Sequence, residues 1–180
     1  IVDEHGLYKN IDFSKTNHYI KKYFNLAKEA QKKKKLFEKK YNIKIANTIG
    51  LYYRGTDKWL EVRPINIFYY IEEVKKLLSK NKKLRVLVLT DQKQIRDKCI
   101  QELGSKAFFI EELPVTDLYK GMHDMPEEER GLDNYNFGVN FLAAIKILSE
   151  CKYVVCCTGN VGYWVCLFRG HFKGVIQLHP

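Results

Sequence analysis

Five consecutive polar or flexible residues near position 54 have the chemistry to bind an anionic ligand. They are Arg54, Gly55, Thr56, Asp57 and Lys58. The residues before them, 48–53, are mostly β-branched, aliphatic and aromatic, which predicts a buried strand. A planar guanidinium donates two parallel charge-assisted hydrogen bonds to a phosphate. The turn therefore indicates a diphosphate site, while a surface turn with a structural Arg54–Asp57 pair explains the same residues equally well.

Two more polar turns follow apolar runs that predict strands. These turns hold Thr90 and Asp91 after residues 84–89, and Thr158, Gly159 and Asn160 after residues 153–157. Ligands of open α/β sheets bind beyond the carboxyl ends of the strands. The last turn is expected to open a helix, whose amides and dipole favour an anion. Asp91 fits two roles at this point, a ligand-site carboxylate or a cap of the following helix.

The sequence motifs of several common nucleotide-binding, catalytic and zinc sites are absent from this chain. The chain has no Walker phosphate loop, no dinucleotide-binding glycine fingerprint and no nucleophile elbow. Its five cysteines include no Cys-x-x-Cys pair, and no histidine lies at ligand spacing, so no zinc site is expected. Buried free thiols, typical of a reducing compartment, are expected instead. His123 is expected to be structural or exposed.

Strand-like and helix-like patterns alternate along the chain. Strands are predicted over residues 48–54, 84–90, 107–110, 153–157 and 174–178. Helices are predicted over residues 17–42 (capped by Asn17, stopped by Asn42), from Pro64 to 80, over 94–103 (stopped by Gly104), over 136–150, and from the turn at 158–162 to 168. Residues 1–16 are expected to be an extended lead-in, and 111–131 a long loop of the kind that forms lids. This alternation predicts an α/β fold: one Rossmann-like domain over residues 1–180, with a parallel sheet and helices on both faces.

The net charge of +10 is concentrated in one segment. Ten lysines and two glutamates between Lys21 and Lys44 give that segment a charge of +8. Such a segment is most often a solvated helix face, but it also fits an anionic membrane surface or an RNA backbone. Nucleic acid is the least favoured partner, because no arginines alternate with aromatic residues there.

The location of the protein is only partly constrained by the sequence. No run of 18 apolar residues occurs, so no transmembrane helix is expected. The chain begins at Ile1 rather than Met, which suggests that residues precede it. A cytoplasmic or membrane-peripheral location is expected, and a secretory lumen stays open.

Three of these segments resemble motifs of GDP-fucose-dependent fucosyltransferases. Residues 50–58, Gly-Leu-Tyr-Tyr-Arg-Gly-Thr-Asp-Lys, resemble the Gly-Val-His-Val-Arg-Arg-Thr-Asp-Lys motif of α1,6-fucosyltransferases, rhizobial nodulation enzymes and, more distantly, protein O-fucosyltransferases. Residues 87–92 are similar to their strand ending in Ala-Thr-Asp-Asp. Residues 147–160 are similar to their third motif, in which a helix, a Leu-Ser pair and an apolar strand lead to a serine-rich turn. Order and spacing agree from about residue 17 to 178, which covers the family's nucleotide-binding half.

The resemblance implies the donor-binding half of a GT-B glycosyltransferase. Such an enzyme transfers fucose from GDP-fucose to a glycan or protein acceptor, with inversion and without a metal or other cofactor. Arg54 would hold the donor's β-phosphate and stabilise the departing nucleotide. Asp57 would be an orienting carboxylate and Asp91 would lie near the donor. Gly159 and Asn160 would form the turn beside the phosphates.

Four positions depart from the family pattern. Tyr52 replaces the motif's histidine, Gly55 its second arginine, and Ala144 an aspartate near the base or ribose. The family's proposed catalytic base falls on Val62, with Glu61 one place short as the candidate. Two alternatives to a transferase stay open: a catalytically incomplete module that binds nucleoside diphosphates, and a basic RNA-binding domain.

Overall fold

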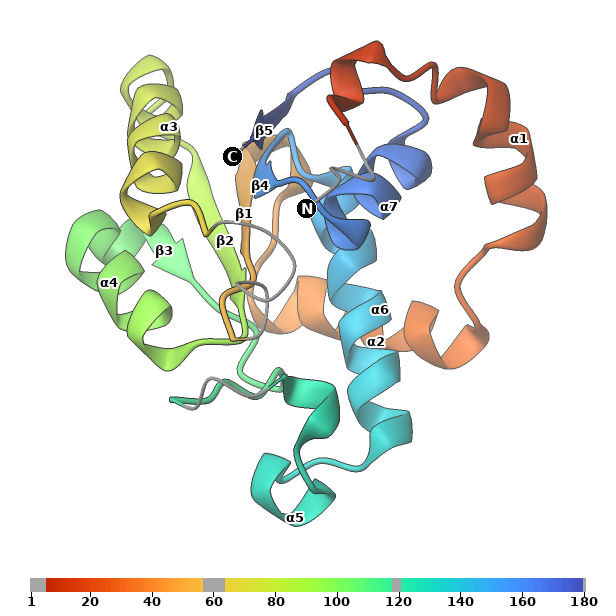
Figure 1. Cartoon of the computed structure of the whole chain (residues 1–180), viewed down its shortest axis with the longest axis vertical. Coiled ribbons are helices and arrows are strands. Elements are labelled where there is room, and N and C mark those ends of the chain that lie inside the picture. Colours follow the sequence, from red (N-terminus) through yellow and green to blue (C-terminus); the bar gives the residue numbers. More distant parts are fainter. Residues whose placement is uncertain (1–5, 57–63, 118–120, 180) are drawn as a thin grey trace.

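The structure is a computed structural model that describes residues 6–56, 64–117 and 121–179, without the side chain of His123. Within these residues a sheet of five parallel strands has the order β3–β2–β1–β4–β5 (Figure 1). The strands are β1 (Thr48–Tyr53), β2 (Arg85–Thr90), β3 (Ala107–Phe108), β4 (Tyr153–Cys157) and β5 (Val175–Leu178). The α/β class and the Rossmann-like parallel sheet are therefore confirmed.

Helices cover both faces of the sheet, as the alternating pattern predicts (Figure 1). The helices α3 (Ile67–Lys80) and α4 (Lys93–Leu103) lie on one face. The helices α2 (Lys28–Lys40), α6 (Asn134–Glu150) and α7 (Asn160–Arg169) lie on the other, with α1 (Ser14–Tyr23) packed against α7 and the short α5 (Glu127–Arg130) before α6. No helix among the described residues is long and apolar enough to cross a membrane.

Alternate residues of each strand divide the buried side chains into two cores. In β1, Leu51 packs toward α3 and α4, whereas Tyr52 packs toward α6 and α7. This period of two is what a strand buried on both faces requires. Gly50 has a specific packing role, because a Cβ there would collide with Leu148 of α6. The glycine thus lets α6 lie directly on the central strand.

The single helix predicted over residues 17–42 is wrong. The chain forms α1 and α2 instead, separated by residues 24–27. Phe24 leaves the helical path and places its ring 5.3 Å from that of Trp164 on α7. The ring stays about half exposed, so the break in the helix is accompanied by this contact with α7 and not by burial of Phe24. Asn42 does mark the end of the segment, with a left-handed φ of 48°.

Smaller boundary predictions also need correction. Asn17 is not a cap, because α1 already begins at Ser14, whose amide donates to Asp12 (3.1 Å). Pro64 precedes α3, which is capped by the side chain of Asn66. The lead-in is not simply extended, because it holds a 3₁₀ turn, η1 (Tyr8–Asn10). The loop over 111–131 contains a further 3₁₀ turn, η5 (Met122–Asp124), and α5.

Candidate functional site

A cavity of about 390 Å³ lies at the carboxyl ends of β1 and β2. Its polar wall is formed by Arg54, Thr90 and Asp91. Phe141 of α6 and Val161 in the first turn of α7 also line it. The strand order reverses between β1 and β4, and ligands of open α/β sheets bind at such a reversal. The cavity therefore occupies the position that this topology favours for a ligand.

The Asp91 carboxylate joins the β1 turn to the β2 turn. One oxygen accepts a hydrogen bond from the amide of Gly55 (3.0 Å), and the other accepts from the hydroxyl of Thr56 (2.7 Å). Gln92, not Asp91, occupies the cap position of α4. The structure thus does not show the helix-cap role, and the carboxylate bonds instead to the turn that follows β1. This carboxylate holds the backbone that follows Arg54.

Gly55, which departs from the resembling motif, lies against two neighbouring side chains. A Cβ at this position would collide with the side-chain amide of Gln92 and would approach the ring of Tyr53 to 2.7 Å. The absent side chain therefore makes room for Gln92 and Tyr53.

Tyr52 lines the cavity at the position where the resembling motif has histidine. Burial raises the pKa of its phenol well above the ordinary value, the charge of Asp91 raises it further, and the Arg54 guanidinium acts in the opposite direction. The phenol is therefore protonated at neutral pH and is a hydrogen-bond donor at the base of the cavity.

One wall of the cavity is aromatic and is formed by α6. The rings of Phe137 and Phe141 on α6 stack with centroids 5.9 Å apart and planes inclined by 10°. The buried Arg130 guanidinium lies 4.8 Å from the centroid of Phe137 and donates to the carbonyl oxygen of Met122 (3.0 Å). Arg130 thereby fixes the loop before α6 to this wall. The four-residue spacing of the phenylalanines is the same in a core helix, so no sequence signal distinguished them.

The turn after β4 is filled from within the protein. Tyr8 is fully buried, and its hydroxyl both donates to the carbonyl oxygen of Gly159 (2.7 Å) and accepts from the amide of Gly159 (2.8 Å). The backbone of Gly159 has φ 153° and ψ 171°, a conformation nearly restricted to glycine. The Gly159 amide, expected beside the donor phosphates, is thus bound to Tyr8.

Gln177 of β5 completes this arrangement. Its side-chain amide donates to the hydroxyl of Thr158 (2.8 Å) and to the carbonyl oxygen of Gly6 (2.9 Å), while its oxygen accepts from the amide of Tyr8 (2.7 Å). Thr158 is correspondingly buried, and Asn160 is exposed at the start of α7. We call the segment from Gly6 to Tyr8 the N-terminal strap. No pattern in residues 1–16 predicted it.

The predicted site residues therefore divide into three groups. The structure brings together Arg54, Gly55, Thr56, Thr90 and Asp91. It places Thr158 and Gly159 against the N-terminal strap and Asn160 at the surface. Asp57, Lys58 and the candidate base Glu61 lie outside the described residues. Ala144 is fully buried in the core and does not line the cavity.

The cysteines conform to the sequence prediction, since all five are free and buried. Burial raises the pKa of the Cys99, Cys151 and Cys166 thiols to about 12. Their thiolate fraction at neutral pH is therefore very small, which makes them unreactive.

No family model matches this chain, and a comparison with curated proteins finds no match. The resemblance to fucosyltransferases consequently depends on the motif residues and on where the fold puts them.

Proposed function

We propose that the cavity binds a nucleoside diphosphate sugar and that the protein transfers the sugar to an acceptor. The observation that carries this proposal is the position of Arg54: it follows the central strand, lines the cavity and lies at the reversal of strand order. A guanidinium there fits two oxygens of a diphosphate. The resemblance of residues 50–58 to the fucosyltransferase motif favours GDP-fucose as the donor.

The remaining cavity residues supply the other parts of a nucleotide site. The stacked pair Phe137 and Phe141 provides a flat apolar wall suited to a purine or a sugar face. The protonated phenol of Tyr52 provides a donor for a phosphate or hydroxyl oxygen. Asp91 keeps the turn after Arg54 in place through Gly55 and Thr56. Pre-organised groups of this kind bind without the cost of ordering them first.

Arg54 is also the group best placed to assist sugar transfer. When the bond between the sugar and the diphosphate breaks, both electrons stay with the diphosphate and its negative charge grows. A fixed guanidinium stabilises that growing charge more than the ground state. The acceptor hydroxyl forms the new bond at the sugar carbon and loses its proton to a base.

A second candidate function follows from the lack of an available carboxylate among the described residues of the cavity. Among the described residues lining the cavity, Asp91 is the one carboxylate, and both of its oxygens already accept hydrogen bonds. The described part of the site thus accounts for diphosphate binding better than for proton removal. A module that binds nucleoside diphosphates without transferring a sugar is the alternative that this observation favours.

The decisive experiment compares binding and turnover in two arginine variants and a control. We expect wild type to bind GDP, measured by calorimetry beside ADP and UDP, and to release GDP from GDP-fucose. Arg54→Ala should lower turnover by about a hundredfold, and Arg54→Lys nearly as much, because an ammonium cannot span two phosphate oxygens. Arg96→Ala on α4, which removes an arginine outside the cavity, should change neither quantity.

Three results separate the two candidates. Turnover by folded Arg54→Ala within threefold of wild type removes the transferase proposal. Loss of GDP affinity in Arg54→Ala, with no turnover by any variant, establishes the binding module. Equal affinity of wild type and Arg54→Ala for all three nucleotides removes the binding module, and it removes the transferase as well when turnover is also unchanged.

A further inference from the structure

The outer face of α1 and the turn after it carry large apolar side chains in contact with solvent. Tyr19, Tyr23 and Phe24 are 54%, 64% and 51% exposed. The two tyrosines lie one helical turn apart, and their rings stack with centroids 6.5 Å apart. Lys21, Lys22 and Lys28 of the same segment are also exposed, and the Lys22 ammonium lies 5.1 Å from the centroid of the Tyr23 ring. We call these six residues the tyrosine–lysine surface.

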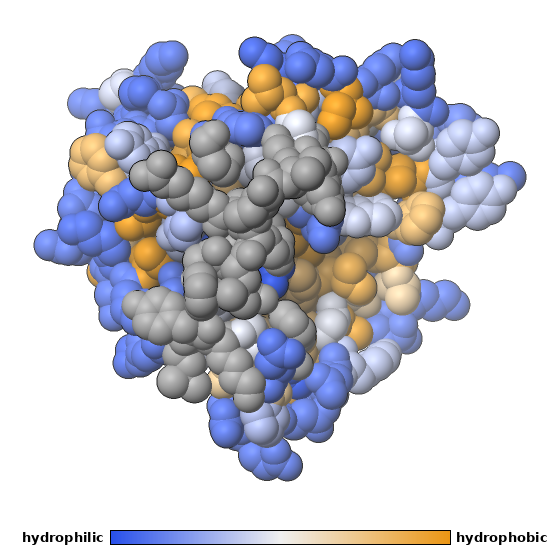
Figure 2. Space-filling model, viewed as in Figure 1, coloured by the Kyte–Doolittle hydropathy of each residue, from blue (hydrophilic) through white to orange (hydrophobic). Residues whose placement is uncertain are grey.

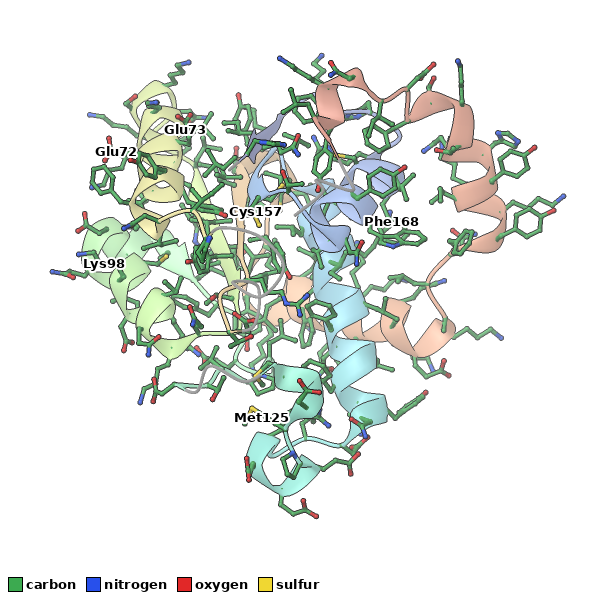
Figure 3. All side chains as sticks on the ribbon, viewed as in Figure 1. Glu72, Glu73, Lys98, Met125, Cys157 and Phe168 are labelled. Carbon is green, nitrogen blue, oxygen red and sulfur yellow. The ribbon has the colours of Figure 1, made fainter. Side chains whose placement is uncertain are left out.

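An apolar groove of about 360 Å³ continues this surface onto α6 and α7. Tyr23 and Phe24 form one side of the groove, and Leu142, Trp164 and Phe168 lie among the residues of the other. Figure 3 shows Phe168 on the side of α7 that faces α1. In the space-filling view, hydrophobic residues gather on this side of the molecule and are bordered by hydrophilic ones (Figure 2).

The neighbouring face of α2 is basic and has few acidic partners. Its exposed residues Lys28, Lys32, Lys35 and Lys39 recur at helical spacing, so they share one face. None of these four forms an ion pair with any acidic residue that the structure describes, in contrast to Lys34, which pairs with Glu38 and Glu150 on the inner side. The ammonium groups of these four lysines are therefore exposed to solvent and accessible to an anionic surface.

We propose that the tyrosine–lysine surface docks on a bilayer that contains anionic phospholipids. Tyrosine side chains favour the headgroup region of a bilayer, because the ring is apolar and its hydroxyl remains in contact with water. Lysines near such a surface attract the lipid phosphates while their aliphatic stems lie along apolar surface. The groove accepts apolar lipid segments next to Phe24 and Leu142. Exposed aromatic residues combined with exposed lysines are the composition of interfacial helices.

RNA fits the same lysines less well. The first arginine of the chain is Arg54, so the basic segment contains lysine alone, whereas base stacking and phosphate forks in RNA sites favour arginine. Aliphatic groove residues such as Leu142 and Ile145 cannot bind phosphate groups and would have no role in an RNA site. The apolar groove thus distinguishes a bilayer from a nucleic acid.

The apolar groove and the ligand cavity are both lined by α6 and α7, but by different residues of these helices. Phe141 and Val161 line the cavity, whereas Ile145 and Trp164 line the groove. The inference therefore does not depend on the proposed function, and urea unfolding tests that each variant is folded.

Vesicle co-sedimentation tests the proposal. Full-length chain is mixed with vesicles of phosphatidylcholine alone or with about one-third phosphatidylserine. We expect binding only to the anionic vesicles, falling as salt is raised. The triple variant Lys21→Gln, Lys22→Gln, Lys28→Gln should bind at least about tenfold more weakly. The double variant Tyr19→Ser, Tyr23→Ser should also bind about tenfold more weakly, because both rings are lost from the headgroup level.

Two variants on the opposite side of the sheet are matched controls. The exposed residues Lys80, Lys82 and Lys83, changed to Gln, remove the same charge. Phe68→Ser with Tyr69→Ser on α3 removes two exposed aromatic rings, 54% and 59% exposed. Both controls should bind within about twofold of wild type, since the effect belongs to one surface and not to total charge or hydrophobicity.

Other results overturn the proposal. Equal binding to neutral and anionic vesicles, or an equal loss in test and control variants, removes the surface as the determinant. Absence of vesicle binding together with binding to polyuridine RNA that needs the lysines but not the tyrosines assigns the surface to nucleic acid. Absence of both kinds of binding leaves it a solvated face.

Discussion

The turns after β1 and β4 lie at the carboxyl ends of neighbouring strands but are organised in opposite ways. Asp91 holds the β1 turn through Gly55 and Thr56, and Arg54 lines the cavity. In the β4 turn, Tyr8 takes both the amide and the carbonyl of Gly159. Equivalent positions in a topology therefore do not guarantee equivalent roles, because a distant segment can satisfy the backbone groups of one turn first.

The largest effect is expected for Tyr8→Ala. Tyr8 is fully buried, and its ring packs edge-to-face on Phe13 and Tyr163. Its removal leaves a cavity and two unpartnered groups on Gly159, so we expect a loss of about 4 kcal/mol in the free energy of unfolding by urea. Tyr19→Ala, at an exposed site, should cost less than about 0.5 kcal/mol. A cost below about 1 kcal/mol for Tyr8→Ala contradicts a structural N-terminal strap.

Tyr8→Phe separates the hydroxyl from the ring. It keeps the packing but leaves the Gly159 amide and carbonyl without their partner, so we expect a loss of about 2 kcal/mol. Affinity for GDP, measured by calorimetry, should stay within about twofold of wild type, because the cavity wall is formed elsewhere. A tenfold fall in GDP affinity in the folded variant makes the β4 turn part of the ligand site.

Asp91→Asn should have the opposite pattern to Tyr8→Phe, because it is expected to lower GDP affinity more than the free energy of unfolding. An asparagine cannot accept from Gly55 and Thr56 with two oxygens, so the turn after Arg54 loses one of its two supports. We expect GDP affinity to fall about tenfold, or 1.4 kcal/mol, and the free energy of unfolding to fall by about 1 kcal/mol. Asp97→Asn, an exposed change on α4, is the control for charge. Unchanged GDP affinity contradicts the support role of Asp91.

The smallest expected effect is the change in stability at alkaline pH, which isolates the Tyr8 hydroxyl from the other groups of the protein. Burial raises the pKa of Tyr8 above its ordinary value of 10.0, against the effect of its bond to Gly159. Above about pH 10 the unfolded chain releases this proton while the folded chain retains it, so stability falls as pH rises, by up to ~1.4 kcal/mol per unit for one group. Tyr8→Phe lacks this group.

The stability gap between wild type and Tyr8→Phe should therefore narrow between about pH 9 and pH 11, by up to about 1 kcal/mol. Urea unfolding of both proteins across this range measures the gap. The buried Tyr52 and Tyr70 titrate in both proteins and cancel in the difference. A gap that stays constant or widens contradicts a neutral, buried Tyr8 hydroxyl.

Local sequence patterns determined the strands and their order along the chain. The apolar run at Tyr153–Cys157 has the bounds of β4, and Gly104 and Asn42 end their helical segments with positive φ angles. These features depend on neighbouring residues alone, through burial period and backbone freedom. For the same reason the positions of Arg54 and Asp91 just beyond strand ends were predictable.

Contacts between distant segments decided what those residues do. Tyr8 and Gly159 are 151 positions apart, and nothing local to either indicates the bond between them. Asp91 reaches Gly55 only because β2 pairs with β1, which makes it a brace of the site and not a helix cap. The helix predicted over residues 17–42 is divided at residues 24–27, where the ring of Phe24 contacts Trp164 on α7. Local patterns determine where the strands and helices form. Side-chain partners depend on which elements the tertiary fold brings into contact, and these partners make the turn after β1 line a cavity while the turn after β4 is occupied by Tyr8.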